Sequence, residues 1–256
     1  MNKISDAFKS GKAFIGFITA GDPDLETTKQ IMKKMADAGC DLIEIGIPFS
    51  DPIAEGPVIQ NANIRALKNN VTTDDVFNMT NEISAELDIP LVYMTYLNVL
   101  FRYGYDRFLK KAKESGICGV IIPDMPYEEK GELQKTARQY GIEVVSLVAP
   151  TSEDRIKLIS TDSEGFVYVV SSLGVTGIRS EIKTDLESIT KVIKENTDTP
   201  IAIGFGINTP EQAKKYASLA DGVIVGSAIV KIIENYGRSA PDEVYKYVKS
   251  MKGAIR

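Results

Sequence analysis

The chain contains no histidine, and this absence excludes more classes of function than any other feature of its composition. Without histidine there is no Ser-His-Asp or Cys-His nucleophile, no histidine general base and no His-ligated zinc or iron site. The two cysteines, Cys40 and Cys118, are too few for a four-thiolate metal site. We therefore expect no metal centre, and proton transfer in such an enzyme falls to carboxylates, lysine, tyrosine or cysteine.

The sequence also lacks a long apolar run, a signal peptide and a basic block. No hydrophobic stretch reaches the roughly 18 residues of a membrane-spanning helix, and residues 1–6 carry no apolar leader. With 30 Lys and Arg against 35 Asp and Glu, the net charge is −5, which argues against a nucleic-acid or anionic-membrane partner. Two cysteines in a long chain are typical of a reducing compartment. These features predict a cytoplasmic protein.

Eight short apolar segments recur along the 256 residues, each followed by a segment of helical character. Most show little alternation of apolar and polar side chains, as expected of parallel strands covered on both faces. This repeat predicts an α/β fold, a single (β/α)8 TIM barrel forming one domain over residues 1–256. A doubly wound open sheet is the competing architecture. Residues 2–10 are expected to form an extra N-terminal helix that closes the barrel bottom. The expected strands are 14–19, 42–47, 90–95, 119–123, 143–148, 166–170, 200–204 and 222–225.

The spacing between the second and third expected strands is the longest in the chain. The surplus lies in residues 48–63, directly after the second strand, and we interpret it as an enlarged loop. Loops that follow the strands form the catalytic face of such barrels. A shaped loop able to serve as a lid is predicted, because prolines fix φ and glycine permits tight turns; the residues concerned are Pro48, Pro52, Gly56 and Pro57.

Glu44 lies inside an apolar strand, where an unpaired carboxylate is costly to bury. Side-chain alternation places Glu44 on the face opposite to Ile43 and Ile45, which point toward the helices. We therefore expect Glu44 to point into the barrel, where burial raises its pKa into a range useful for acid–base catalysis. The alternative is a structural glutamate paired with a buried Lys or Arg. Asp51 and Glu55 in the following loop are candidates for a second acid–base group, or are solvated loop carboxylates.

Glycines follow the last three strands, at the expected catalytic face. Gly174-Val-Thr-Gly177 follows the sixth strand, Gly204-Phe-Gly206 the seventh, and Gly226-Ser227 the eighth. Backbone N–H groups at such turns and at a helix N-terminus bind phosphate. Together they predict a phosphorylated small-molecule ligand, although each glycine alone is equally consistent with a turn. Four other residues could contact that ligand or serve only in packing: Phe17, Ile59, Tyr96 and Tyr168.

Residues 44–63, Glu-Ile-Gly-Ile-Pro-Phe-Ser-Asp-Pro-Ile-Ala-Glu-Gly-Pro-Val-Ile-Gln-Asn-Ala-Asn, closely resemble the signature of the tryptophan synthase alpha chain family. Further segments resemble the family in the same order along the chain: 17–23, 96–98, 123–126, 174–177, 204–206 and 226–227. The resemblance therefore spans nearly the whole sequence.

Members of this family are (β/α)8 barrels that cleave indole-3-glycerol phosphate to indole and glyceraldehyde 3-phosphate in tryptophan biosynthesis. The resemblance implies that this chain is a carbon–carbon lyase with Glu44 and Glu55 as its catalytic carboxylates. Position 55 is ordinarily an aspartate in the family, so Glu55 is a departure, and its extra methylene bears on the rate. The substrate-binding residues that the resemblance implies are Phe17, Ile59, Tyr96, Tyr168, Thr176, Gly177, Gly206, Gly226 and Ser227.

Family members work with a separate beta chain that carries pyridoxal phosphate, in an alpha2-beta2 assembly. The resemblance implies that partner for this chain, and no cofactor in this chain itself. Asp51, Asn98 and Pro126 match interface positions, which ordinary loop structure explains equally well. Two other functions remain open. One is a regulatory subunit that binds the phosphorylated ligand and activates the beta chain, and the other is a barrel enzyme acting on a different phosphorylated substrate.

Overall fold

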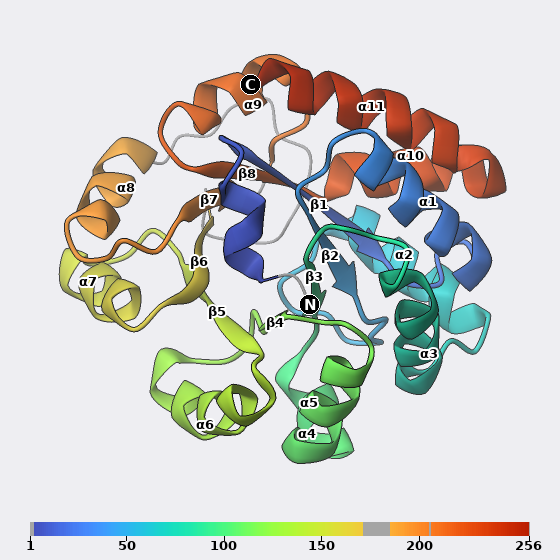
Figure 1. Cartoon of the computed structure of the whole chain (residues 1–256), viewed down its shortest axis with the longest axis horizontal. Helices are drawn as coiled ribbons and strands as arrows, with labels where there is room; N and C mark the ends of the chain where they lie inside the picture. The colour runs from blue at the N-terminus through green and yellow to red at the C-terminus, as the bar shows by residue number, and fades with distance from the viewer. Residues whose placement is uncertain (1–2, 171–184, 205, 256) are drawn as a thin grey trace.

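The computed structural model describes residues 3–170, 185–204 and 206–255, and its centre is a closed parallel barrel of eight strands (Figure 1). Each strand pairs with the next, and the last pairs with the first. The predicted TIM barrel is therefore confirmed, with strand ends that lie within two residues of the expected ones. The strands are β1 (Ala13–Thr19), β2 (Leu42–Gly46), β3 (Leu91–Met94), β4 (Gly119–Ile121), β5 (Glu143–Val148), β6 (Glu164–Val170), β7 (Ile201–Gly204) and β8 (Gly222–Val225).

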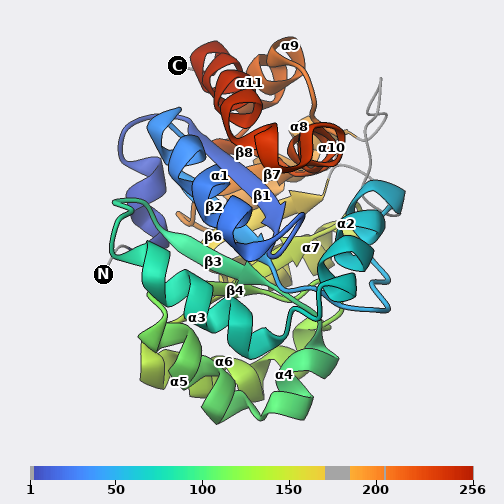
Figure 2. The same ribbon diagram turned by 90° about the vertical axis from the view of Figure 1, so that its right-hand side faces the viewer.

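Helices cover the outside of the barrel. In the side view of Figure 2, α9 to α11 lie on one side of the strands and α3 to α6 on the opposite side. Within the described ranges, no helix is both long and apolar enough to cross a bilayer. The α-helices are α1 (Leu25–Asp37), α2 (Pro57–Lys68), α3 (Thr73–Ser84), α4 (Leu97–Tyr103), α5 (Tyr105–Glu114), α6 (Lys130–Tyr140), α7 (Glu153–Thr161), α8 (Leu186–Lys194), α9 (Pro210–Ala217), α10 (Ser227–Tyr236) and α11 (Ala240–Ala254), and the 3-10 helices are η1 (Ile4–Phe8), η2 (Tyr127–Glu129) and η3 (Gly237–Ser239).

Side-chain alternation along the strands separates two apolar cores. Leu42 and Val92 belong to the core inside the barrel, whereas Ile43 and Ile45 belong to the layer between the strands and the helices. All five residues of β2 are buried, which explains why this strand shows little alternation in its sequence. The inward direction expected for Glu44 is confirmed, because Glu44 shares the parity of Leu42.

The short helix η1 closes the amino-terminal end of the barrel (Figure 1). Its Ile4 is fully buried and belongs to the interior core. Two glycines make room for this side chain, because a Cβ at Gly119 or Gly165 would lie 2.5 or 2.8 Å from Ile4 Cδ1. The extra N-terminal helix expected at the barrel bottom is present, but it is a 3-10 helix of five residues, shorter than the 2–10 range predicted.

The segment 48–63, which we expected to be one enlarged loop, forms a loop only as far as Gly56. There α2 begins, with Gly56 as its N-cap and Pro57 in its first turn. Reading Pro57 as a loop residue was wrong, because proline at the first helical position costs no hydrogen bond and its fixed φ suits the helix. As a result, Ile59 and Asn63 are held on the buried face of a helix.

Candidate active site

A cavity opens at the carboxyl ends of the strands, and its empty space, including the part open to solvent, is about 620 Å³. Its position is that of catalytic sites in such barrels. The described residues that line it are Phe17, Glu44, Ala54, Glu55, Ile59, Met94, Pro123, Leu147, Tyr168, Gly206, Ile207, Ile224, Gly226 and Ser227. Expected site residues from distant parts of the sequence therefore meet at one cavity. They come from β2, the loop after it, α2 and β6, and from the segments that follow β7 and β8.

Glu44 sits at the inner wall of this cavity and is fully buried. Its Cα lies beside Phe17 of β1 and Val92 of β3 in the sheet register. Neither carboxylate oxygen has a hydrogen-bond partner among the described residues, and no Lys or Arg in those ranges pairs with it. Burial raises the pKa of Glu44 to about 8. A carboxyl group in this state keeps its proton at neutral pH and can donate it.

Glu55 lies at the end of the loop that follows β2 and is only 7% exposed, so it is not a solvated loop carboxylate. The Asn63 side-chain amide donates a hydrogen bond to Glu55 Oε2 at 2.7 Å. Burial raises the pKa of Glu55 to about 7, against the opposing effect of hydrogen bonds from Asn63 and Tyr96. Gln60 binds the backbone carbonyl of Glu55 at 2.7 Å, which fixes the chain at this point.

Two aromatic rings, Phe17 and Tyr168, line the cavity, and glycines make room for both. A Cβ at Gly46 would lie 2.7 Å from Cζ of Phe17, and a Cβ at Gly204 would lie 2.6 Å from the hydroxyl oxygen of Tyr168. Burial and the nearby carboxylate of Glu44 raise the pKa of Tyr168 well above its ordinary value, so this hydroxyl stays protonated. Each ring thus packs against a glycine of the neighbouring strand, where a side chain would displace it.

Sequence reasoning missed part of the apolar lining. Met94, Leu147 and Ile224 line the cavity from β3, β5 and β8. Each lies on the inward face of its strand, so the alternation that located Glu44 could have found them. Tyr96 is not among the described lining residues, because it lies behind the loop after β2. Its hydroxyl accepts the N–H of Ala54 at 3.2 Å, and its ring stacks on Phe49 with centroids 5.2 Å apart.

Three of the residues expected to bind phosphate line the cavity: Gly206, Gly226 and Ser227. Gly226 is the N-cap of α10 and gives it no side-chain cap, so the first turn presents its amide groups beside the cavity. The positive end of the helix dipole favours an anion there. Gly206 has a φ of +84°, which glycine adopts without strain. Thr176 and Gly177 lie outside the described residues.

The residues expected at a partner interface are all exposed. Asp51 follows β2, Asn98 lies on α4, and Pro126 precedes η2. Two large apolar side chains are also exposed, Ile53 by 72% in the loop after β2 and Phe101 by 73% on α4. Exposed apolar side chains of this kind suit a protein partner. In the described part of the chain, no cluster of Cys, Asp and Glu side chains could hold a metal ion.

A family model for the tryptophan synthase alpha chain matches residues 5–256. The chain belongs to this family. It is similar to the tryptophan synthase alpha chains of Thermoanaerobacter sp. (strain X514), with 49% identity over 100% of both chains, and of Lacticaseibacillus casei, with 47% identity over 100% of this chain and 96% of the relative. The resemblance stated from the sequence is thus confirmed.

Solved structures of the tryptophan synthase family also resemble this chain. An alpha chain from Legionella pneumophila has a TM-score of 0.89 at 36% identity and covers 100% of this chain and 97% of its own. A chain of the tryptophan synthase complex from Pyrococcus furiosus has a TM-score of 0.86 at 38% identity, with 95% and 99% covered. The barrel and its alpha chain family are therefore supported by sequence and by structure.

Proposed function

We propose that this chain is a carbon–carbon lyase of tryptophan biosynthesis, which cleaves indole-3-glycerol phosphate to indole and glyceraldehyde 3-phosphate. One observation carries the proposal. Two buried carboxyl groups, Glu44 and Glu55, line a cavity whose other lining is mainly apolar and includes two glycines. Such a cavity suits an aromatic ring near the acids and a phosphate near the helix amino end.

Glu44 is the proton shuttle in this proposal. Because burial raises its pKa to about 8, it enters the reaction protonated and gives its proton to C3 of the indole ring. The protonated ring is able to take up the electrons of the bond to the glycerol side chain when that bond breaks. The substrate thus acts as its own electron sink. The Glu44 carboxylate next removes the proton of the adjacent side-chain hydroxyl, the C–C bond breaks, and an aldehyde forms. Glu44 ends the cycle protonated, as it began.

In its ionised form, the Glu55 carboxylate accepts a hydrogen bond from the indole N–H. Protonation at C3 leaves positive charge at the ring nitrogen, and a carboxylate in a buried cavity stabilises that charge strongly. Asn63 and Tyr96 favour the ionised form of Glu55, because their hydrogen bonds lower its pKa against the effect of burial. The two acids thus take different roles because their environments differ.

The phosphate end of the substrate lies at the amino end of α10 in this proposal, against the N–H groups of Ser227 and its neighbours. Gly206 and Gly226 allow close approach, since neither carries a side chain. Thr176 and Gly177 are proposed to complete this end of the site on the strength of the resemblance. This binding fixes the ring against the two acids, which is how binding energy remote from the reacting bond contributes to the rate.

A beta chain is the proposed partner, in an alpha2-beta2 assembly, with pyridoxal phosphate bound only by that beta chain. Supporting this proposal is the likeness to a chain of the Pyrococcus furiosus tryptophan synthase complex. The proposed contact surface contains Asp51, Asn98 and Pro126, and the exposed Ile53 and Phe101 add apolar area to it. We propose no cofactor for this chain, because two carboxyl groups account for every proton transfer above.

The test is indole formation by the Glu44→Gln variant. Wild-type chain and variant are incubated with indole-3-glycerol phosphate, with and without a tryptophan synthase beta chain, and free indole is measured. Loss of a general acid–base group lowers the rate by about 10²- to 10⁴-fold. Glu143→Gln is the matched control, because Glu143 is a glutamate at the amino end of β5, away from the cavity. Circular dichroism checks that each variant is folded.

Two outcomes contradict the proposal in different ways. Substantial turnover by the Glu44 variant removes Glu44 from the proton-transfer role. No indole from the wild-type chain, with or without the beta chain, contradicts the lyase activity and favours the regulatory subunit instead.

A further inference from the structure

We propose that Asn63 is a positioning residue, which sets the orientation of the Glu55 carboxylate at the cavity. This inference rests on the proposed function, because it assigns a role within that reaction. Asn63 lies on α2, eight residues after Glu55, and its side chain is 5% exposed. Its Nδ2 donates to Glu55 Oε2 at 2.7 Å, a short contact for a hydrogen bond to a carboxylate.

The amide of Asn63 is itself fixed in one orientation. Its Oδ1 accepts the backbone N–H of Phe49 at 3.2 Å, and its Nδ2 also donates to the carbonyl of Ile59 at 3.1 Å. An N–H can be accepted only by the amide oxygen, so the NH2 group faces Glu55. One buried side chain therefore joins the start of the loop, the end of the loop and the helix that follows. Only the contact to Glu55 reaches a carboxyl group that lines the cavity.

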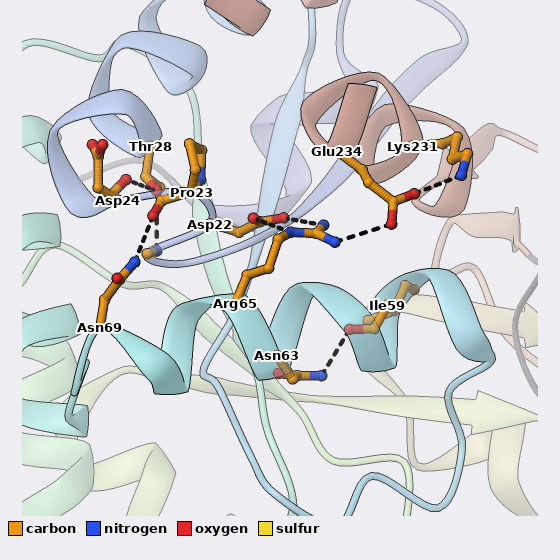
Figure 3. A network of polar contacts seen from close by, with 11 residues as sticks. Asp22, Pro23, Asp24, Thr28, Ile59, Asn63, Arg65, Asn69, Lys231 and Glu234 are labelled. Atoms are coloured by element: carbon orange, nitrogen blue, oxygen red, sulfur yellow. Dashed lines mark hydrogen bonds and ion pairs between the residues drawn. The ribbon is translucent and has the colours of Figure 1, made fainter. Parts of the chain in front are cut away.

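The helix that carries Asn63 is anchored to two other elements (Figure 3). Two residues further along, Arg65 Nε and Nη2 bind both oxygens of the buried Asp22 at 2.8 Å each. Arg65 Nη1 also binds Glu234 on α10 at 3.1 Å. Helix α10 begins at Ser227, which lines the cavity. Asn63 thus holds Glu55 from a support that is also tied to the helix proposed to bind phosphate.

A glutamate gains more from such a support than a shorter acid would. Its side chain has three rotatable bonds, and the freedom to rotate must be lost before the carboxylate can meet the substrate. A donor at 2.7 Å selects one orientation in advance, and hydrogen bonding to a carboxylate favours the ionised form that receives the indole N–H. Asn63 therefore acts on both the direction and the charge of Glu55 without contact to substrate.

Asn63→Asp tests this role, because aspartate has nearly the same shape as asparagine. The variant keeps an oxygen to accept the Phe49 N–H, but it replaces the donor to Glu55 by a second carboxylate. We expect kcat to fall on the order of tenfold to a hundredfold, with little change in KM, because a hydrogen bond to a charged group is lost. The limb of the kcat/KM profile set by Glu55 should move to higher pH, since a like charge disfavours ionisation.

The control is Asn69→Asp, because Asn69 is exposed and donates to the carbonyl of Pro23 just past the end of α2. Burial raises the pKa of the other titratable groups around Glu55, namely Glu44, Tyr96 and Tyr168, and both variants keep all three. Carbon-13 NMR titration of the Glu55 carboxyl, assigned by its loss in Glu55→Gln, measures the same effect without substrate. If Asn63→Asp does not fold, Asn63→Ala takes its place, because it removes the donor without adding charge. The kcat of that variant and the titration of its Glu55 carboxyl then test the role of Asn63.

The outcomes separate this inference from the function on which it rests. An active wild type with reduced kcat and a raised Glu55 pKa in the Asn63 variant, and neither change in the Asn69 variant, supports it. An active wild type whose kcat and Glu55 titration are unchanged by the Asn63 substitution overturns the role of Asn63 and leaves the lyase function standing. A wild type that forms no indole overturns both.

Discussion

Replacing Glu44 by glutamine should remove a large pH dependence from the stability of the fold. Glu44 is fully buried, and neither of its oxygens has a partner among the described residues. Burial raises its pKa from 4.5 to about 8 in the folded chain, whereas the unfolded chain keeps the ordinary value. Between these two pH values the folded protein therefore holds a proton that the unfolded chain releases.

The sign and size follow from this difference in proton binding. Because the folded state binds more protons than the unfolded state, the free energy of unfolding falls as the pH rises from 4.5 to about 8. One pKa unit corresponds to about 1.4 kcal/mol, so the loss reaches about 3 kcal/mol at pH 7 and about 4 kcal/mol at pH 8, and approaches about 5 kcal/mol above that. Glutamine does not ionise, so the Glu44→Gln variant gains stability relative to the wild type over this range and then levels off.

Urea unfolding of both proteins from pH 5 to pH 9 measures this effect. The quantity to compare is the difference between the two proteins in the free energy of unfolding of the native state. Other groups, including Glu55, titrate in both proteins, so their contributions to this difference cancel. The exposed Glu114 provides a control, because Glu114→Gln is the same substitution at a position that faces solvent. If wild type and Glu44→Gln gave parallel curves, the buried and unpaired state of Glu44 would be refuted.

Two further predictions concern the cavity. The kcat/KM for indole formation should rise with pH as Glu55 ionises near 7 and fall as Glu44 ionises near 8, giving a narrow bell-shaped profile; a profile that is flat between pH 6 and 9 would contradict the roles of both acids. Gly204→Ala should cost about 1–3 kcal/mol in thermal unfolding and lower kcat/KM, because its Cβ would meet the Tyr168 hydroxyl at 2.6 Å, whereas Gly253→Ala, with open space around it, should do neither.

The barrel and the position of Glu44 could be predicted from the sequence because both depend on local patterns. Eight apolar segments with helical segments between them specify the repeat, and a carboxylate in an apolar strand has a direction fixed by the alternation of side chains. The glycines after β7 and β8 were found for the same reason, since their place next to a strand end is visible in the sequence. Each of these predictions needs only neighbours along the chain.

The state of Glu55 could not be predicted, because it depends on residues distant in the sequence. Its burial requires α2 to begin at Pro57, which we interpreted as part of a loop, and its hydrogen bonds come from Asn63 and Tyr96. Nothing near Glu55 in the sequence distinguishes it from the exposed Asp51. The partner surface, the roles of Thr176 and Gly177, the assignment of one domain and the cytoplasmic location stay predictions.

The closed floor of the barrel gives a direction to the movement of product. Ile4, Ile15, Leu42 and Val92 fill the described interior below Glu44, so indole formed at that residue leaves toward the opposite end, where the cavity opens. The loop after β2, which bears the exposed Ile53, borders that end through Ala54 and Glu55. A receiving subunit seated at this rim could capture each indole molecule before it diffuses into the surrounding water, and sealing one end is what makes such a one-way handover possible.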